Sequence, residues 1–88
     1  MVRKKIKHYK LAGTVSDATG SPLGGVRVAL PEFHIEDRTN EDGRFELQVI
    51  AESQRIVNLV AQKQGYQTVS LSPTLGDSGL SFALKRMP

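Results

Sequence analysis

The side chains best suited to bind a cation gather just before one glycine: Asp37, Asn40, Glu41 and Asp42. If Gly43 were the sixth residue of a calcium-binding EF-hand loop, the first and twelfth positions would have to carry oxygen ligands. Arg38 and Val49 stand at those positions, so two ligands are missing. Asn, Asp and Gly also favour tight turns. We therefore interpret the cluster as a turn and expect no metal there.

Other residues that support catalysis or metal binding are scattered along the chain. There are two histidines, His8 and His34, and no cysteine, whereas a zinc site normally takes three or four such ligands. No serine lies in the Gly-x-Ser-x-Gly arrangement of a nucleophile elbow. We expect no cofactor and no catalytic residue, and we predict that the chain is not an enzyme.

The positive charge of the chain is concentrated at its start. Residues 1–10 carry five basic side chains and no acid, and the rest has seven basic and nine acidic side chains. Residues 1–8 are predicted to be a basic N-terminal tail or linker, with a patch for anionic lipid or nucleic acid as the alternative. No nucleic-acid binding by the domain is expected, and membrane contact is expected only through a parent protein or this tail. The start has no signal-peptide pattern.

Short strands would position any site. Apolar and polar residues alternate in runs bounded by turn-forming residues. Strands are predicted at 9–16, 26–30, 37–39, 44–50, 55–63, 67–71 and 80–84. Residues 31–36 and 72–79 are expected to be loops, and no segment favours a helix. These features predict a single all-β domain, a β-sandwich, over residues 9–86.

One turn organises this prediction. Asp42-Gly43 is a strong hairpin signal because Gly accepts the positive φ of a tight turn. It is predicted to join strand 37–39 to strand 44–50 as a β-hairpin. Phe45, Leu47 and Val49 would then face the core.

A candidate interaction surface follows from the alternation in run 55–63. Val57, Leu59 and Ala61 form a wholly apolar phase and are expected in the core, which leaves Ile56 and Val60 on the outer face. Phe33 and Ile35, from the preceding loop, are expected to join them. Scattered surface hydrophobes are the alternative interpretation of these four residues.

The sequence also resembles a known family at three places: residues 11–28 (LAGTVSDATGSPLGGVRV), residues 39–47 (TNEDGRFEL) and Gly65-Tyr66. These stretches are similar to the opening, the central hairpin and a third landmark of carboxypeptidase regulatory-like domains. The resemblance implies a transthyretin-like, seven-stranded antiparallel Greek-key β-sandwich. It also implies an accessory module beside peptidases, outer-membrane receptors or surface proteins, hence an extracytoplasmic or membrane-associated setting, without catalytic residues.

The function predicted from these observations is protein–protein contact or domain spacing within a larger protein or assembly. The partner would be another protein, a neighbouring domain or a second copy of this chain. The alternative is a small-ligand or carbohydrate-binding module that uses the end loops. Its aromatic platform would have to come from Tyr9, Phe33 and Tyr66, because Phe45 and Phe82 are expected in the core.

Overall fold

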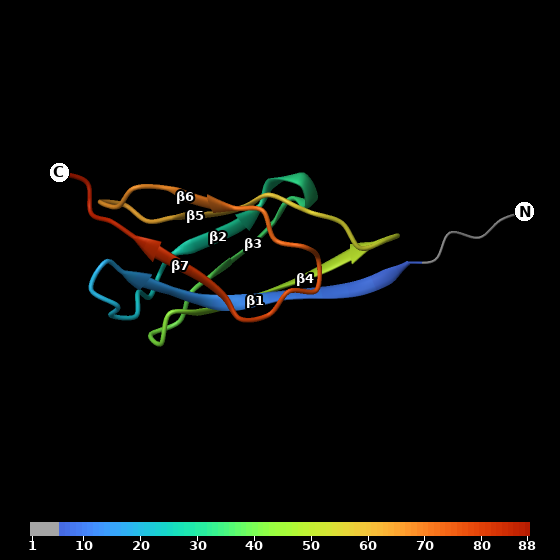
Figure 1. Ribbon diagram of the computed structural model, residues 1–88, viewed down its shortest axis with the longest axis horizontal. Coiled ribbons are helices and arrows are strands. Elements are labelled where there is room, and N and C mark those ends of the chain that lie inside the picture. Colours follow the sequence, from blue (N-terminus) through green and yellow to red (C-terminus); the bar gives the residue numbers. More distant parts are fainter. Residues whose placement is uncertain (1–5) are drawn as a thin grey trace, which may run out of the picture.

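The computed structural model describes residues 6–88, and in them alternating apolar residues form short strands that make two facing sheets (Figure 1). The strands are β1 (Lys7–Asp17), β2 (Arg27–Leu30), β3 (Ile35–Arg38), β4 (Arg44–Ala51), β5 (Leu59–Gln62), β6 (Val69–Leu71) and β7 (Leu80–Leu84). The all-β class is confirmed, and the two sheets are consistent with a β-sandwich.

One sheet has three strands in the order β4-β1-β7, and the other has four in the order β3-β2-β5-β6. Every pair in the four-stranded sheet is antiparallel, and so is β1 with β4. β1 and β7, however, run parallel, with Gly13 opposite Leu80 and Asp17 opposite Leu84. The prediction of a purely antiparallel fold is therefore wrong at this pair. The chain reaches β7 from β6 in the other sheet, so no hairpin forces the two strands to run in opposite directions.

The core lies between the sheets and follows the predicted alternation. Phe45, Leu47 and Val49 of β4 are buried, and the Phe45 ring meets the Phe82 ring with centroids 5.9 Å apart. Val57, Leu59 and Ala61 are buried as expected. Leu75 is fully buried as well, although it lies in the predicted loop 72–79. That loop therefore closes one part of the core instead of lying free on the surface.

The turn at Gly43 links the two sheets. β3 and β4 belong to different sheets, so the predicted in-sheet hairpin is wrong. Gly43 has φ +73° and donates its N–H to the Asn40 carbonyl at 2.9 Å. Its own carbonyl accepts the Val15 N–H of β1 at 2.7 Å. This backbone contact draws the turn onto β1 and directs the chain from one layer into the other.

Several boundaries differ from the prediction. β1 begins at Lys7, opposite Ala51, and His8 lies opposite Ile50, so these two residues belong to a strand and not to the tail. Residues 1–5 of the predicted tail lie outside the described residues. Residues 31–33 form one turn of 3-10 helix, η1 (Pro31–Phe33).

Two strands of the four-stranded sheet also depart from expectation. β3 begins at Ile35, two residues before the predicted start, and ends at Arg38. β5 covers only Leu59–Gln62 because its partner β2 has four residues. Ile56 makes an isolated bridge to Thr74 instead.

Candidate interaction surface

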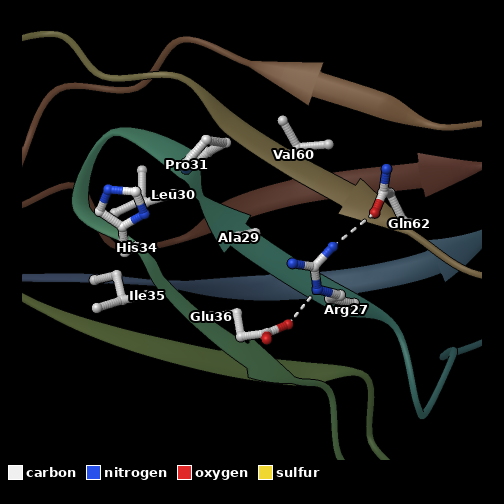
Figure 2. Close-up of a pocket in the computed structure, with 9 residues that line it drawn as sticks. All are labelled: Arg27, Ala29, Leu30, Pro31, His34, Ile35, Glu36, Val60 and Gln62. Atoms are coloured by element: carbon white, nitrogen blue, oxygen red, sulfur yellow. Dashed lines mark hydrogen bonds and ion pairs between the residues drawn. The ribbon is translucent and has the colours of Figure 1, made fainter.

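The outer face of the four-stranded sheet carries a shallow hollow of about 580 Å³ across β2, β3 and β5 (Figure 2). Its apolar part comes from Ala29, Pro31, Ile35 and Val60. Strand register explains part of this grouping, since Ala29 of β2 lies opposite Val60 of β5. Alternation turns both side chains away from the core.

The other end of the hollow is polar. Arg27 donates from Nη1 to Gln62 Oε1 at 3.0 Å and forms an ion pair through Nε with Glu36 (Figure 2). The three side chains come from three adjacent strands, so they tie the polar end together across the sheet. An exposed ion pair of this kind contributes about 0–1 kcal/mol to stability. Together with the Gln62 hydrogen bond, it holds the Arg27 guanidinium between β3 and β5.

His34 lies at the edge of the hollow in an unusual backbone conformation. It ends η1 with φ 55°, in the left-handed region, and donates its N–H to the Pro31 carbonyl at 3.3 Å. Residues other than Gly are uncommon there, although Asn, Asp and His occur there more often than the rest. This tight turn brings Pro31 and Ile35 to the same end of the hollow.

The four residues predicted for an interaction surface fall into three places. Val60 and Ile35 both line the hollow. Phe33 lies outside it, half-buried, with the Arg55 guanidinium 5.0 Å from its ring centroid. Ile56 precedes β5 and is 69% exposed, and it does not line the hollow. Two of the four therefore share one site.

Sequence reasoning missed the rest of the hollow. Alternation in strand 26–30 turns Arg27 away from Val26 and Val28, but nothing in the sequence shows that Glu36 and Gln62 flank it, since they lie nine and 35 positions away. His34 was interpreted as a loop residue. The exposed Ile50 was overlooked, although continuing the alternation from Glu46 and Gln48 places it on the outer face.

In the acidic cluster before Gly43, side-chain oxygens accept hydrogen bonds from nearby backbone N–H groups. Asn40 Oδ1 accepts the N–H groups of Asp42 and Arg44, each at 3.0 Å. The Asp37 carboxylate accepts the Arg38 N–H at 2.8 Å and the Glu46 N–H at 3.0 Å. Within residues 6–88, no three His, Cys, Asp or Glu side chains are arranged to hold a metal ion. No helix in this part of the chain is long and apolar enough to cross a membrane.

The turn that follows β1 is also held by side-chain hydrogen bonds within the turn. Asp17 Oδ1 accepts the Thr19 hydroxyl at 2.6 Å, the Thr19 N–H at 2.9 Å and the Ser21 N–H at 3.0 Å. These donors lower the pKa of Asp17 below its ordinary 3.8, and the Thr19 hydroxyl has the largest effect. These three hydrogen bonds to Oδ1 fix the shape of the turn.

The three aromatics of the predicted ligand platform are separate. Tyr66 lies beside Arg86, whose guanidinium is 5.9 Å from its ring centroid. Phe33 lies under Arg55, and Tyr9 packs against the core from β1. None of the four main hollows among residues 6–88 is lined by two of them.

Comparisons with known proteins inform the fold. No protein-family model matches the sequence, and no curated protein matches it. Among solved structures, the chain is similar to the crystal structure of 3-chlorocatechol 1,2-dioxygenase from Rhodococcus opacus 1CP, with a TM-score of 0.67 and 14% identity. The match covers 91% of this chain and 60% of the dioxygenase chain. At this identity the likeness concerns the fold alone.

Proposed function

We propose that this chain is a non-catalytic accessory β-sandwich module that contacts another protein through the hollow on β2, β3 and β5. The observation that carries the proposal is the grouping of Val60, Ala29 and Pro31 beside the Arg27–Gln62 pair in one hollow, with Ile35 at its edge. Apolar centres with polar rims are typical of protein interfaces.

The size of the hollow limits its role. Burial of one valine or isoleucine side chain contributes about 1.5–3 kcal/mol, and association itself costs several kcal/mol. Two or three such anchors therefore support a weak contact, of the kind that positions a neighbouring domain or holds a module within an assembly.

The finer fold assignment belongs to the same proposal. We propose that the strands form a seven-stranded Greek-key sandwich of the transthyretin-like type, as in carboxypeptidase regulatory-like domains. The resemblance at residues 11–28 and 39–47 supports it. So does the requirement for glycine at position 43, where a positive φ and contact with β1 coincide.

A photo-crosslinking experiment tests the contact. A photoreactive residue at Gln62, on the rim of the hollow, is introduced in the cells that make the protein. We expect one discrete crosslinked product, of protein partner or second copy, that disappears in Val60→Lys and persists in Ser81→Lys on the other sheet. Circular dichroism verifies that both variants fold. The absence of a product, or a product that persists in Val60→Lys, would refute the proposal.

A further inference from the structure

A second hollow adjoins the first on the four-stranded sheet, and its charged lining is entirely basic. This basic hollow has a volume of about 850 Å³ and shares Arg27 and Gln62 with the first one. Its other walls include residues 63–66, which follow β5, and Met87 near the C-terminus. Figure 1 shows the turn after β5 and the C-terminal segment at the same end of the molecule. Segments distant in the sequence therefore meet around this hollow.

The basic side chains are gathered here more densely than the composition predicts. Residues 11–88 carry seven basic and nine acidic side chains, so an even distribution would place acids at least as often as bases. The basic hollow is instead lined by Arg27, Arg38 and Lys63 and by no acid. Arg86 adds a fourth cation beside it, because its guanidinium lies 5.9 Å from the ring centroid of Tyr66, a lining residue. Four of the seven basic side chains thus lie at one hollow.

Two of the arginines are direct neighbours across the sheet. Arg27 of β2 lies opposite Arg38 of β3, and alternation places Arg38 on the same outer face as Glu36, which pairs with Arg27. Like charges directly opposite each other in a sheet are destabilising. Glu36 balances one of the two guanidinium groups, and no ion pair within residues 6–88 engages Arg38. A bound anion would relieve the repulsion that remains.

Lys63 is held in place without a counter-charge. Its side chain is half-buried, and its Nζ donates to the Gly24 carbonyl at 3.0 Å. That oxygen is uncharged, and an ammonium group has three donors. The contact therefore fixes the position of the ammonium group while its charge and further donors remain for a ligand.

Nearby acids do not supply the missing negative charge. Glu36 already pairs with Arg27 and lines the first hollow only. The Asp37 carboxylate accepts two backbone N–H groups, and alternation places it on the other face of β3. Glu41 and Asp42 follow on the turn before Gly43, and neither lines the basic hollow. The charge of the hollow must therefore be balanced from outside this part of the chain.

We propose that the basic hollow binds a phosphate monoester group. Such a group carries up to two negative charges near neutral pH and offers three acceptor oxygens. The Arg38 guanidinium can donate two parallel hydrogen bonds to it, and Lys63 provides a fixed point charge. A single carboxylate would balance only one charge. The volume is in the range of small-ligand sites, so the molecule that carries the phosphate has room beside Tyr66 and Thr68.

An NMR titration of the whole chain tests the inference. The probes are inorganic phosphate and glycerol phosphate, with the ionic strength held constant by sodium chloride. We expect saturable chemical-shift changes at the Arg38 side chain and at the amides of residues 63–66. Acetate should bind at least about tenfold more weakly, because it loses a charge-assisted hydrogen bond. No saturable change, or equal binding of acetate and phosphate, would overturn the inference.

Matched variants locate the binding. Arg38→Gln and Lys63→Gln should each weaken phosphate binding about tenfold. Arg44→Gln and Lys10→Gln remove the same charges outside the basic hollow and should change it less than about twofold, since exposed distant charges are screened. Arg44 and Arg38 line another hollow together, so equal losses in these two variants would overturn the inference. Circular dichroism verifies folding, and the arginine pair decides if Lys63→Gln does not fold.

Vesicles distinguish the source of the phosphate. Phosphatidic acid presents a monoester headgroup, so the chain is sedimented with vesicles of phosphatidylcholine with and without it. Because basic residues 1–10 also attract such vesicles, the comparison is between the original chain and Arg38→Gln. Sedimentation that falls in Arg38→Gln would identify a lipid headgroup, and phosphate binding without that fall would identify a soluble monoester.

The basic hollow and the proposed contact surface can be tested separately. Arg38 and Lys63 do not line the first hollow. Crosslinking from Gln62 should therefore persist in Arg38→Gln, in which phosphate binding is weakened. Failure of one experiment leaves the outcome of the other unaffected.

Discussion

The Thr39 hydroxyl joins the segment after β3 to the connection between β1 and β2. Thr39 is 5% exposed, and its Oγ1 accepts the Val26 N–H at 2.9 Å and donates to the Leu23 carbonyl at 2.6 Å. Its backbone N–H donates to the Val26 carbonyl at 3.0 Å. This polar residue therefore satisfies buried backbone groups on the connection that leads into β2.

Replacing that hydroxyl should be costly. Thr39→Val has nearly the same shape but leaves the Val26 N–H and the Leu23 carbonyl without a partner. We expect the free energy of unfolding to fall by about 1–3 kcal/mol, measured by urea denaturation. Thr39→Ser keeps the hydroxyl and should lose clearly less. If both variants lost the same unfolding free energy, Thr39 would stabilise the fold by packing and not by hydrogen bonding.

Replacing Gly43 and Gly20 by alanine separates two effects of an added Cβ: strain from a positive φ and a steric clash with neighbouring atoms. Both glycines have positive φ. A Cβ at Gly43 would collide with the Val15 carbonyl oxygen, whereas a Cβ at Gly20 meets nothing within 4 Å. We expect Gly20→Ala to cost about 1–2 kcal/mol of unfolding free energy and Gly43→Ala substantially more. Similar denaturation midpoints for the two variants would contradict this explanation.

At the scale of elements, the turn after β1 should make stability depend on pH. The folded-state pKa of Asp17 is lowered, chiefly by the Thr19 hydroxyl. Its ionised form is therefore favoured by folding. The resulting stabilisation is present above the ordinary pKa of 3.8 and is lost as the pH falls through the lowered folded-state value.

An NMR titration of the Asp17 carboxyl checks that prediction. Thr19→Val should move the pKa of Asp17 back toward 3.8 because the largest cause of the shift is removed. In Asp17→Asn, the pH dependence of unfolding free energy in this acid range should become weaker than in the original chain. A titration of Asp17 unchanged by Thr19→Val would contradict the assignment of the hydroxyl.

β4 should show alternating amide exchange in the free protein. The N–H groups of Leu47 and Val49 point toward β1, opposite Leu11 and Tyr9, so they should exchange slowly. The N–H groups of Gln48 and Ile50 have no such partner and should exchange much faster. Hydrogen exchange followed by NMR measures this directly. Uniform protection along β4 would show that the free edge is covered.

Local patterns predicted some elements well and others poorly. β4 and β7 combine strict alternation with clear turn signals, and their buried faces are as predicted. β5 is shorter than its apolar run because strand length depends on a partner distant in sequence. The parallel pairing of β1 with β7 was missed for the same reason, since residues about 67 positions apart determine it.

In the candidate site too, local alternation predicted one feature, and pairing with distant strands determined the rest. Alternation placed Val60 on an outer face, and the structure sets it opposite Ala29. Alternation alone does not give the neighbours of Val60, because register across strands decides them. Ile56 was grouped with Val60 by spacing, but its bridge to Thr74 separates it from β5.

For the molecule as a whole, the two sheets present different surfaces. The outer face of the four-stranded sheet carries the hollow with the Arg27–Gln62 pair. The three-stranded sheet has the partly open edge of β4 beside Lys7 and Lys10. Because the two surfaces belong to different layers, a substitution at the proposed contact surface should leave the edge of β4 unchanged.

The parallel pairing of β1 with β7 has a mechanical consequence. β1 begins and β7 ends at opposite ends of the long axis (Figure 1). Tension applied through the two termini would slide these strands past each other, so the hydrogen bonds between them would bear the load together. We expect a high unfolding force by atomic force spectroscopy with end attachment, and a lower one when pulling between Gly20 and the C-terminus. Equal forces would show that this pair of strands is not the mechanical clamp of a module able to carry tension.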